Sequence, residues 1–180
     1  MRLFVAIDLP PEVIGALEAL LERLRPSARI AWSPPSNLHI TTKFIGWWPD
    51  ERLGEVMAAL AGVPRRGPID VAVRGLGFFP NARSPRVFWC GVEAPALAAV
   101  AADTDRATAA LGIESEKRAF APHLTLARIK ERIDMGPLRQ AIEALPTTDF
   151  GQFRTESFYL YQSTLRPTGS IYTKLETFPL

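Results

Sequence analysis

The segment Asn37-Leu38-His39-Ile40-Thr41-Thr42 has a counterpart, Pro122-His123-Leu124-Thr125-Leu126, in which the histidine lies 84 positions further along the chain. Both segments place a histidine, an apolar residue and a threonine in succession within a run that predicts a β-strand. The 180 residues contain only these two histidines. The repeat therefore predicts two similar lobes, each of which gives one histidine strand to a shared cleft.

Spacing gives the two motifs a physical meaning, because residues two positions apart on a strand share one face. His39 and Thr41 are therefore expected to point the same way, and so are His123 and Thr125. The apolar residues between and after them should anchor each strand from behind; these are Leu38, Ile40 and Phe44 in the first strand, and Leu124 and Leu126 in the second.

The hydrophobic pattern around the motifs predicts a mixture of strands and helices. Strands are expected over residues 3–8, 29–32, 38–45, 69–78, 86–92, 122–129, 150–161 and 171–178, and helices over 13–24, 49–60, 97–111 and 137–145. Short turns between strands favour antiparallel pairing over a doubly wound parallel sheet. We expect an α+β fold, a single domain over residues 1–180 with two pseudo-symmetric lobes of mainly antiparallel sheet and outer helices flanking a central cleft.

Composition excludes several classes of protein. Apolar residues make up 47% of the chain and charged residues 22%, as in ordinary globular proteins. A net charge of +2 argues against a protein that coats nucleic acid, although a small basic cleft is compatible with it. No signal peptide or membrane span is apparent, so we expect a cytoplasmic monomer without a membrane partner.

The single cysteine, Cys90, excludes an intramolecular disulfide and any multi-thiolate metal site. It lies in the apolar run Val87-Phe88-Trp89-Cys90-Gly91-Val92, which predicts a buried strand. We therefore expect Cys90 to be an inert core residue rather than a nucleophile.

Two imidazoles, each paired with a hydroxyl, suit phosphoryl chemistry at neutral pH. The pKa of histidine, ordinarily about 6.5, allows it to give or take a proton there. Opening a cyclic phosphodiester needs a base that deprotonates water and an acid that protonates the departing ribose oxygen. Thr41 and Thr125 are expected to hold the non-bridging oxygens of the phosphate. From the residues alone, a pair of unrelated strand histidines is about as plausible as this shared site.

Two other kinds of site are weakly supported. A zinc site would need a cluster of His, Cys and carboxylate residues at ligand spacing, which the chain lacks. A Ser-His-Asp hydrolase would be expected to carry a Gly-x-Ser-x-Gly turn, which is also missing.

At these residues the chain resembles the two-histidine (2H) phosphoesterases, and closely their RNA 2′,3′-cyclic phosphodiesterase branch, historically called 2′-5′ RNA ligase. The resemblance covers nearly the whole chain. It includes residues 2–8, Trp32, residues 37–46, 85–92, 118–128 and 163–165, with Gly169 and Tyr172. One departure is Thr42, where the branch usually has an apolar residue.

The resemblance implies hydrolysis of a terminal RNA 2′,3′-cyclic phosphate to a 2′-phosphate and a free 3′-hydroxyl, without a metal or other cofactor. It implies that His39 donates a proton to the leaving 3′-oxygen and that His123 activates water; sequence alone would allow the opposite roles. Reversible 2′-5′ ligation is implied as a secondary activity. The expected partners are RNA ends or nucleotides that carry a 2′,3′-cyclic phosphate.

Arg128 matches an arginine that the family uses on the substrate phosphate. Five positions after His123, an ideal strand would turn it to the opposite face, so its role requires a bulge or the end of the strand. Arg118 is a weaker candidate. Lys43 has two open interpretations, a phosphate contact or a solvated lysine.

Aromatic pairs near strand ends, Trp47-Trp48 and Phe78-Phe79, could stack unpaired bases, although core packing is expected for most of them. Two functional alternatives stay open. One is a non-catalytic module that binds RNA ends, and the other is a 2H phosphodiesterase that acts on a small cyclic nucleotide.

Overall fold

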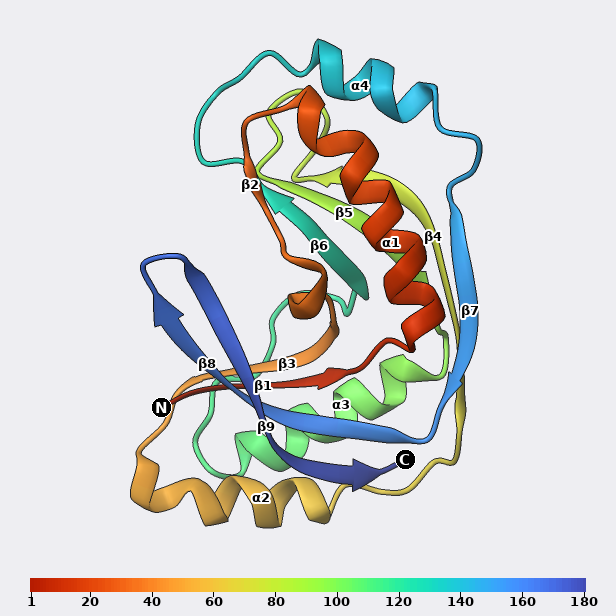
Figure 1. Cartoon of the computed structure of the whole chain (residues 1–180). Helices are drawn as coiled ribbons and strands as arrows, with labels where there is room; N and C mark the ends of the chain where they lie inside the picture. The colour runs from red at the N-terminus through yellow and green to blue at the C-terminus, as the bar shows by residue number, and fades with distance from the viewer.

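The computed structural model describes residues 1–180, which form two antiparallel sheets (Figure 1). The first sheet has the strand order β3 (Ile40–Trp47), β1 (Arg2–Ile7), β8 (Ser157–Arg166), β9 (Gly169–Pro179). The second has the order β2 (Ala31–Trp32), β6 (His123–Arg128), β5 (Val87–Glu93), β4 (Ile69–Phe79), β7 (Asp149–Thr155). The expected α+β class with antiparallel pairing is confirmed.

Each sheet carries a pair of α-helices. α1 (Pro11–Leu24) packs against β7 and against α4 (Gly136–Glu143), whereas α3 (Leu97–Ala109) packs against β3 and against α2 (Leu53–Ala61). Three short 3₁₀ helices, η1 (Arg25–Ser27), η2 (Pro35–Asn37) and η3 (Asp50–Arg52), complete the fold. α1 shows why the helices form: a proline occupies its first turn, and its apolar stripe is buried at Val13, Leu17, Leu20, Leu21 and Leu24.

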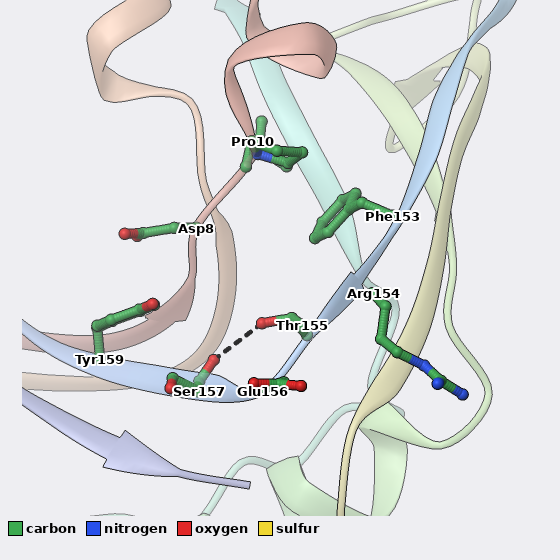
Figure 2. A pocket seen from close by; sticks show the side chains of 9 residues that line it. Asp8, Pro10, Phe153, Arg154, Thr155, Glu156, Ser157 and Tyr159 are labelled. Carbon is green, nitrogen blue, oxygen red and sulfur yellow. Dashed lines mark hydrogen bonds between the residues drawn. The ribbon is translucent and has the colours of Figure 1, made fainter.

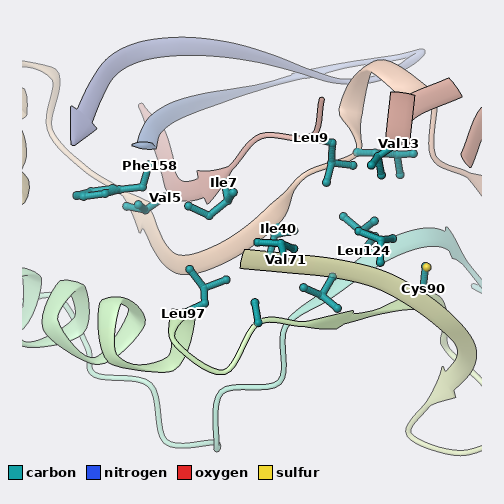
Figure 3. Packing of buried hydrophobic residues seen from close by; sticks show 14 of the residues in the cluster. Val5, Ile7, Leu9, Val13, Ile40, Val71, Cys90, Leu97, Leu124 and Phe158 are labelled. Atoms are coloured by element: carbon teal, nitrogen blue, oxygen red, sulfur yellow. The ribbon is translucent and has the colours of Figure 1, made fainter. Parts of the chain in front are cut away.

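One hydrophobic core of 37 buried residues joins the two sheets. Ile40 of β3, Leu124 of β6 and Val71 of β4 lie near one another within it (Figure 3). Cys90 is part of this core, and burial raises the pKa of its thiol to about 12. The expectation of an unreactive core cysteine is therefore confirmed.

The sequence-based expectation of one strand over residues 150–161 is wrong. The chain is extended on both sides of Glu156, but β7 pairs with β4 of the second sheet and β8 pairs with β1 of the first. The Glu156 carbonyl instead accepts a hydrogen bond from the Leu180 amide at 2.9 Å. The break is a change of pairing partner, and no proline marks it in the sequence. No helix has the length and apolar character that crossing a bilayer requires.

Candidate functional site

The first histidine motif lies on the outer strand of the first sheet. In the antiparallel ladder Thr41 is opposite Ala6, and side chains directly opposite each other share a face. Ala6 and Phe4 are two positions apart, so Phe4 also lies on this face. His39 precedes β3 by one residue, and its ring centroid is 4.8 Å from that of Phe4. His39 and Thr41 therefore share one face of the first sheet, as expected, and we call it the histidine face.

His39 is enclosed by aromatic rings. The Tyr172 ring meets it edge-on at 5.0 Å between centroids, and Tyr161 lies 6.5 Å away. His39 Nδ1 is 2.6 Å from the Asn37 carbonyl oxygen, which only accepts hydrogen bonds, so Nδ1 donates and Nε2 is left for a reactant. Desolvation lowers the pKa of His39 from its ordinary value, more than the Asn37 hydrogen bond and the Asp8 charge raise it.

Asp8 organises the side chains beside His39. Its carboxylate accepts one hydrogen bond from the Tyr161 hydroxyl at 2.5 Å and another from Lys174 Nζ at 2.6 Å. Burial and this hydrogen bond raise the pKa of Tyr161. None of Asp8, Tyr161 and Lys174 was expected to have a role from the sequence. For Asp8, the position of a carboxylate directly after the apolar run of residues 3–7 was the available signal.

The second motif repeats this geometry in the second sheet. His123 is the first residue of β6, and its Nδ1 lies 2.8 Å from the Ala121 carbonyl oxygen. In both motifs Nδ1 is thus held by the carbonyl two residues earlier, which leaves Nε2 for chemistry. The Phe79 ring stands edge-on to His123 at 5.1 Å between centroids.

Arg128 lies on the same face as Thr125. The β5–β6 register shifts at Leu126, between the Trp89–Thr125 and Phe88–Ala127 pairs. Beyond this bulge Arg128 is opposite Val87, which shares a face with Trp89. A bulge therefore restores the orientation that ideal alternation would have denied. Arg128 is exposed and forms no ion pair with any carboxylate.

A bulge at the matching place in β3 overturns two expectations. The β1–β3 register shifts at Thr42, which brings Lys43 to the buried side. There Lys43 Nζ binds Asp105 Oδ1 and the Glu114 carbonyl, each at 2.6 Å, so it is neither a phosphate contact nor a solvated lysine. Phe44 turns to the histidine face and is 60% exposed, so its expected core position is wrong. Both motif strands thus carry a bulge three positions after the histidine.

The other candidate residues divide between core and surface. Trp48 and Phe78 pack as core residues, Trp48 with its indole N–H bonded to the Arg52 carbonyl and Phe78 against the ring of Phe88. Trp47 is exposed. Arg118 is exposed in the loop before β6.

The two motif strands belong to different sheets but contact each other. The residues that follow the two histidines, Ile40 and Leu124, both belong to the shared core (Figure 3). In Figure 1 the end at which β6 begins lies on the side of the molecule that holds β3, and its arrowhead points away from β3. The fold therefore brings into contact the two motif strands, which come from distant parts of the chain.

A pocket of about 410 Å³ adjoins this region at the junction of β7 and β8 (Figure 2). Neither histidine lines it. Asp8, Tyr159, Thr155 and Glu156 do, so it borders the histidine face through Asp8. No group of three or more His, Cys, Asp or Glu side chains is arranged as a metal ion would require.

Comparison with known proteins places this geometry in a family. The sequence profile of the LigT-like phosphoesterases matches residues 7–89 and 91–172. An RNA 2′,3′-cyclic phosphodiesterase of Methanocaldococcus jannaschii is 34% identical over 172 residues, covering 96% of each chain. One of Thermus thermophilus is 34% identical over 188 residues, covering all of this chain and 90% of the relative.

Solved structures agree with this placement. TT0787 of Thermus thermophilus has a TM-score of 0.83 and 34% identity, with 100% of this chain and 98% of that chain covered. LigT of E. coli, solved with 3′-AMP, has a TM-score of 0.80 and 27% identity, with 99% and 97% covered. With a profile match over nearly the whole length and relatives above 30% identity, the chain belongs to the LigT-like phosphoesterase family.

Proposed function

We propose that this protein is an enzyme that hydrolyses the 2′,3′-cyclic phosphate at an RNA end to a 2′-phosphate and a free 3′-hydroxyl. One observation carries the proposal. Two histidines on contacting strands each have Nδ1 fixed by a backbone carbonyl and each share a face with a threonine. The curated relatives named RNA 2′,3′-cyclic phosphodiesterase support the same substrate.

In the proposed step a water oxygen attacks phosphorus while the bond from phosphorus to the ribose 3′-oxygen breaks. His123 takes the proton that the water loses, and His39 gives a proton to the departing 3′-oxygen. Thr41 and Thr125 donate hydrogen bonds to the non-bridging oxygens, and Arg128 adds positive charge there. No metal takes part. The histidines end with their protons exchanged, and solvent restores them.

The environment of His39 bears on its role as the acid. Its lowered pKa makes its imidazolium a stronger acid than that of an exposed histidine. The same shift favours the neutral ring in the free enzyme. A bound phosphodiester anion would raise the pKa again, because a nearby negative charge favours the protonated ring. We therefore propose that His39 takes up its proton together with the substrate.

A short RNA with a 2′,3′-cyclic phosphate end, incubated with EDTA and followed by mapping of the product phosphate, tests this proposal. We expect complete conversion to the 2′-phosphate. A 3′-phosphate product would refute the assigned leaving group. Loss of activity in EDTA that zinc or magnesium restores would refute the metal-free mechanism.

The same assay separates the alternatives. A non-catalytic module would bind the RNA and leave its end unchanged, while an enzyme for small cyclic nucleotides would open those and spare RNA.

Reversible 2′-5′ ligation would use a 5′-hydroxyl of a second RNA in place of water, and we propose it as a secondary activity. We further propose that the protein acts as a cytoplasmic monomer.

A further inference from the structure

Two large aromatic side chains of β3 are exposed, Phe44 at 60% and Trp47 at 76%. Neither has an aromatic partner within the chain. Exposed apolar side chains that cluster on one element commonly mark a site of interaction. They lie on the strand that follows His39, so their position relative to the histidine face decides what they could bind.

Both side chains lie on the histidine face. Phe44 is opposite Phe4, whose ring contacts His39. Trp47 is opposite Arg2, which shares a face with Phe4 because the two are two positions apart. Trp47 is three positions after Phe44, and regular alternation would place the two on opposite faces. A second register shift, at Ile45, returns Trp47 to the histidine face.

The chemistry of this surface matches single-stranded nucleic acid. Arg2 is exposed, lies opposite Trp47 and forms no ion pair, while the carboxylate of Asp50, three residues after Trp47, is bound by the N-terminal amine at 2.7 Å. β3 is also the outer strand of its sheet, so one edge of its backbone is unpaired. Aromatic planes with an adjoining free cation are what proteins use to stack unpaired bases and hold the phosphates between them.

We propose that the RNA nucleotides on the 5′ side of the cyclic phosphate run along β3, stack on Phe44 and then on Trp47, and place a phosphate at Arg2. The inference rests on the proposed function, because the terminal phosphate at His39 sets the register. Phe44 lies five residues beyond His39, on the order of 15 Å at the rise of a β-strand. Such a distance places it past the terminal nucleotide, and the enzyme therefore selects RNA over mononucleotides.

The test compares kcat/KM for a mononucleoside 2′,3′-cyclic phosphate with kcat/KM for a single-stranded RNA that ends in the same nucleotide. We define the ratio as kcat/KM for the RNA divided by kcat/KM for the mononucleotide, and we expect it to exceed one in the wild type. Stacking contributes about 1–3 kcal/mol per base, so Phe44→Ala and Trp47→Ala should each lower the ratio about 5- to 150-fold. Trp47→Phe keeps an aromatic plane, so this variant should retain most of the wild-type preference for RNA. Arg2→Ala should make the dependence of kcat/KM for RNA on salt concentration less steep. The slope of log(kcat/KM) against log[salt] should fall by about the amount that one phosphate contact contributes.

Ile171→Ala is the matched control. Ile171 is 52% exposed in the first sheet, and its neighbour Tyr172 faces His39, so Ile171 lies on the opposite face. This variant should keep the wild-type ratio. Far-UV circular dichroism of each variant establishes that the fold is retained.

The outcomes are distinguishable. If neither substrate is opened, the proposed function itself fails. If both are opened and the ratio stays unchanged in Phe44→Ala and Trp47→Ala, the RNA path along β3 is refuted while the function stands. If Trp47→Ala instead converts a dimer to a monomer in sedimentation, a second copy of the chain covers this face and the inference is also overturned.

Discussion

At the scale of single residues, the environment makes the two histidines unlike each other. His39 lies among Phe4, Tyr161 and Tyr172, which remove it from water, whereas the structure records only Phe79 as an aromatic neighbour of His123. The carboxylate of Asp8 attracts the charged form of His39, but desolvation outweighs that attraction. The two histidines of the proposed acid–base pair thus have different surroundings even though the two motifs match in sequence.

Proton titration of the two histidines by NMR tests this asymmetry directly, since the chain has only two imidazole Cε1–H signals. We expect the His39 signal to titrate below about 6.5, the ordinary value, because its charged form is desolvated. A saturating 2′-nucleotide should raise that midpoint. His39→Gln removes one signal and so assigns the other. Titration of His39 at or above the ordinary value would contradict the structure's account of its burial.

The same burial predicts a pH dependence of stability. A histidine with a lowered pKa in the folded state binds its proton more readily when unfolded, so the free energy of unfolding falls as the pH decreases from about 6.5 to the folded-state pKa. Urea unfolding at a series of pH values should show this fall in the wild type. It should be smaller in His39→Gln, and equal slopes would refute the expected linkage.

At the scale of secondary-structure elements, the bulges in β3 and β6 decide which side chains reach the site. Alternation predicted the faces of His39, Thr41, His123 and Thr125, because no bulge precedes them within their strands. Alternation gave the wrong faces for Lys43 and Phe44, because they follow the bulge at Thr42 in β3. A bulge adds one residue without any required glycine or proline, so the pattern of apolar residues does not locate it.

Most strand and helix positions were predictable to within a few residues, since the apolar periodicity is strong. The break between β7 and β8 at Glu156 was not predictable in this way. No proline marks the change within residues 150–161, and only the pairing of Val5 with Leu160 and of Val71 with Phe153 assigns the two halves to different sheets. Pairing between distant strands is a property of the packed chain, and local sequence does not encode it. Likewise, Asp8 gained its role only when β8 and β9 brought Tyr161 and Lys174 beside it.

The buried ion pair behind β3 gives an element-scale prediction. The Lys43 side chain is 3% exposed, and its ammonium bonds Asp105 and the Glu114 carbonyl. Lys43→Met would leave the Asp105 carboxylate with the Glu116 amide but without its positively charged partner, so we expect it to lower the free energy of unfolding by about 3 kcal/mol. Denaturant unfolding measures the change.

Lys117→Met is the matched control, because Lys117 pairs with Glu114 at 83% exposure and should contribute less than about 1 kcal/mol. Equal effects of the two substitutions would show that burial does not set the strength of the Lys43 pair.

At the scale of the whole molecule, the chain crosses between the sheets several times and the two lobes share one core. β1 lies in the first sheet, β2 in the second and β3 again in the first, while β7 and β8 divide at Glu156. The relative position of the two histidines therefore depends on the packing of both lobes, with Ile40 and Leu124 as contributors from either side.

This shared core predicts that the lobes unfold together. Far-UV circular dichroism and tryptophan fluorescence should report one coincident transition in urea. Leu124→Ala should shift both signals equally, by about 2–5 kcal/mol. Two separate transitions would mean that the lobes are independent, and the core would then not fix the geometry of the site.

The proposed mechanism requires His39 and His123 to act on one phosphorus atom as acid and base. Rates of cyclic-phosphate opening on a short RNA in EDTA, measured for His39→Ala, His123→Ala and the double variant, test it most directly. We predict that each single variant stays folded and loses about 10²–10⁴-fold in rate. The double variant should be little worse than either, because the two groups serve one step. A single variant that keeps a rate close to the wild type would show that the substituted histidine is neither the acid nor the base.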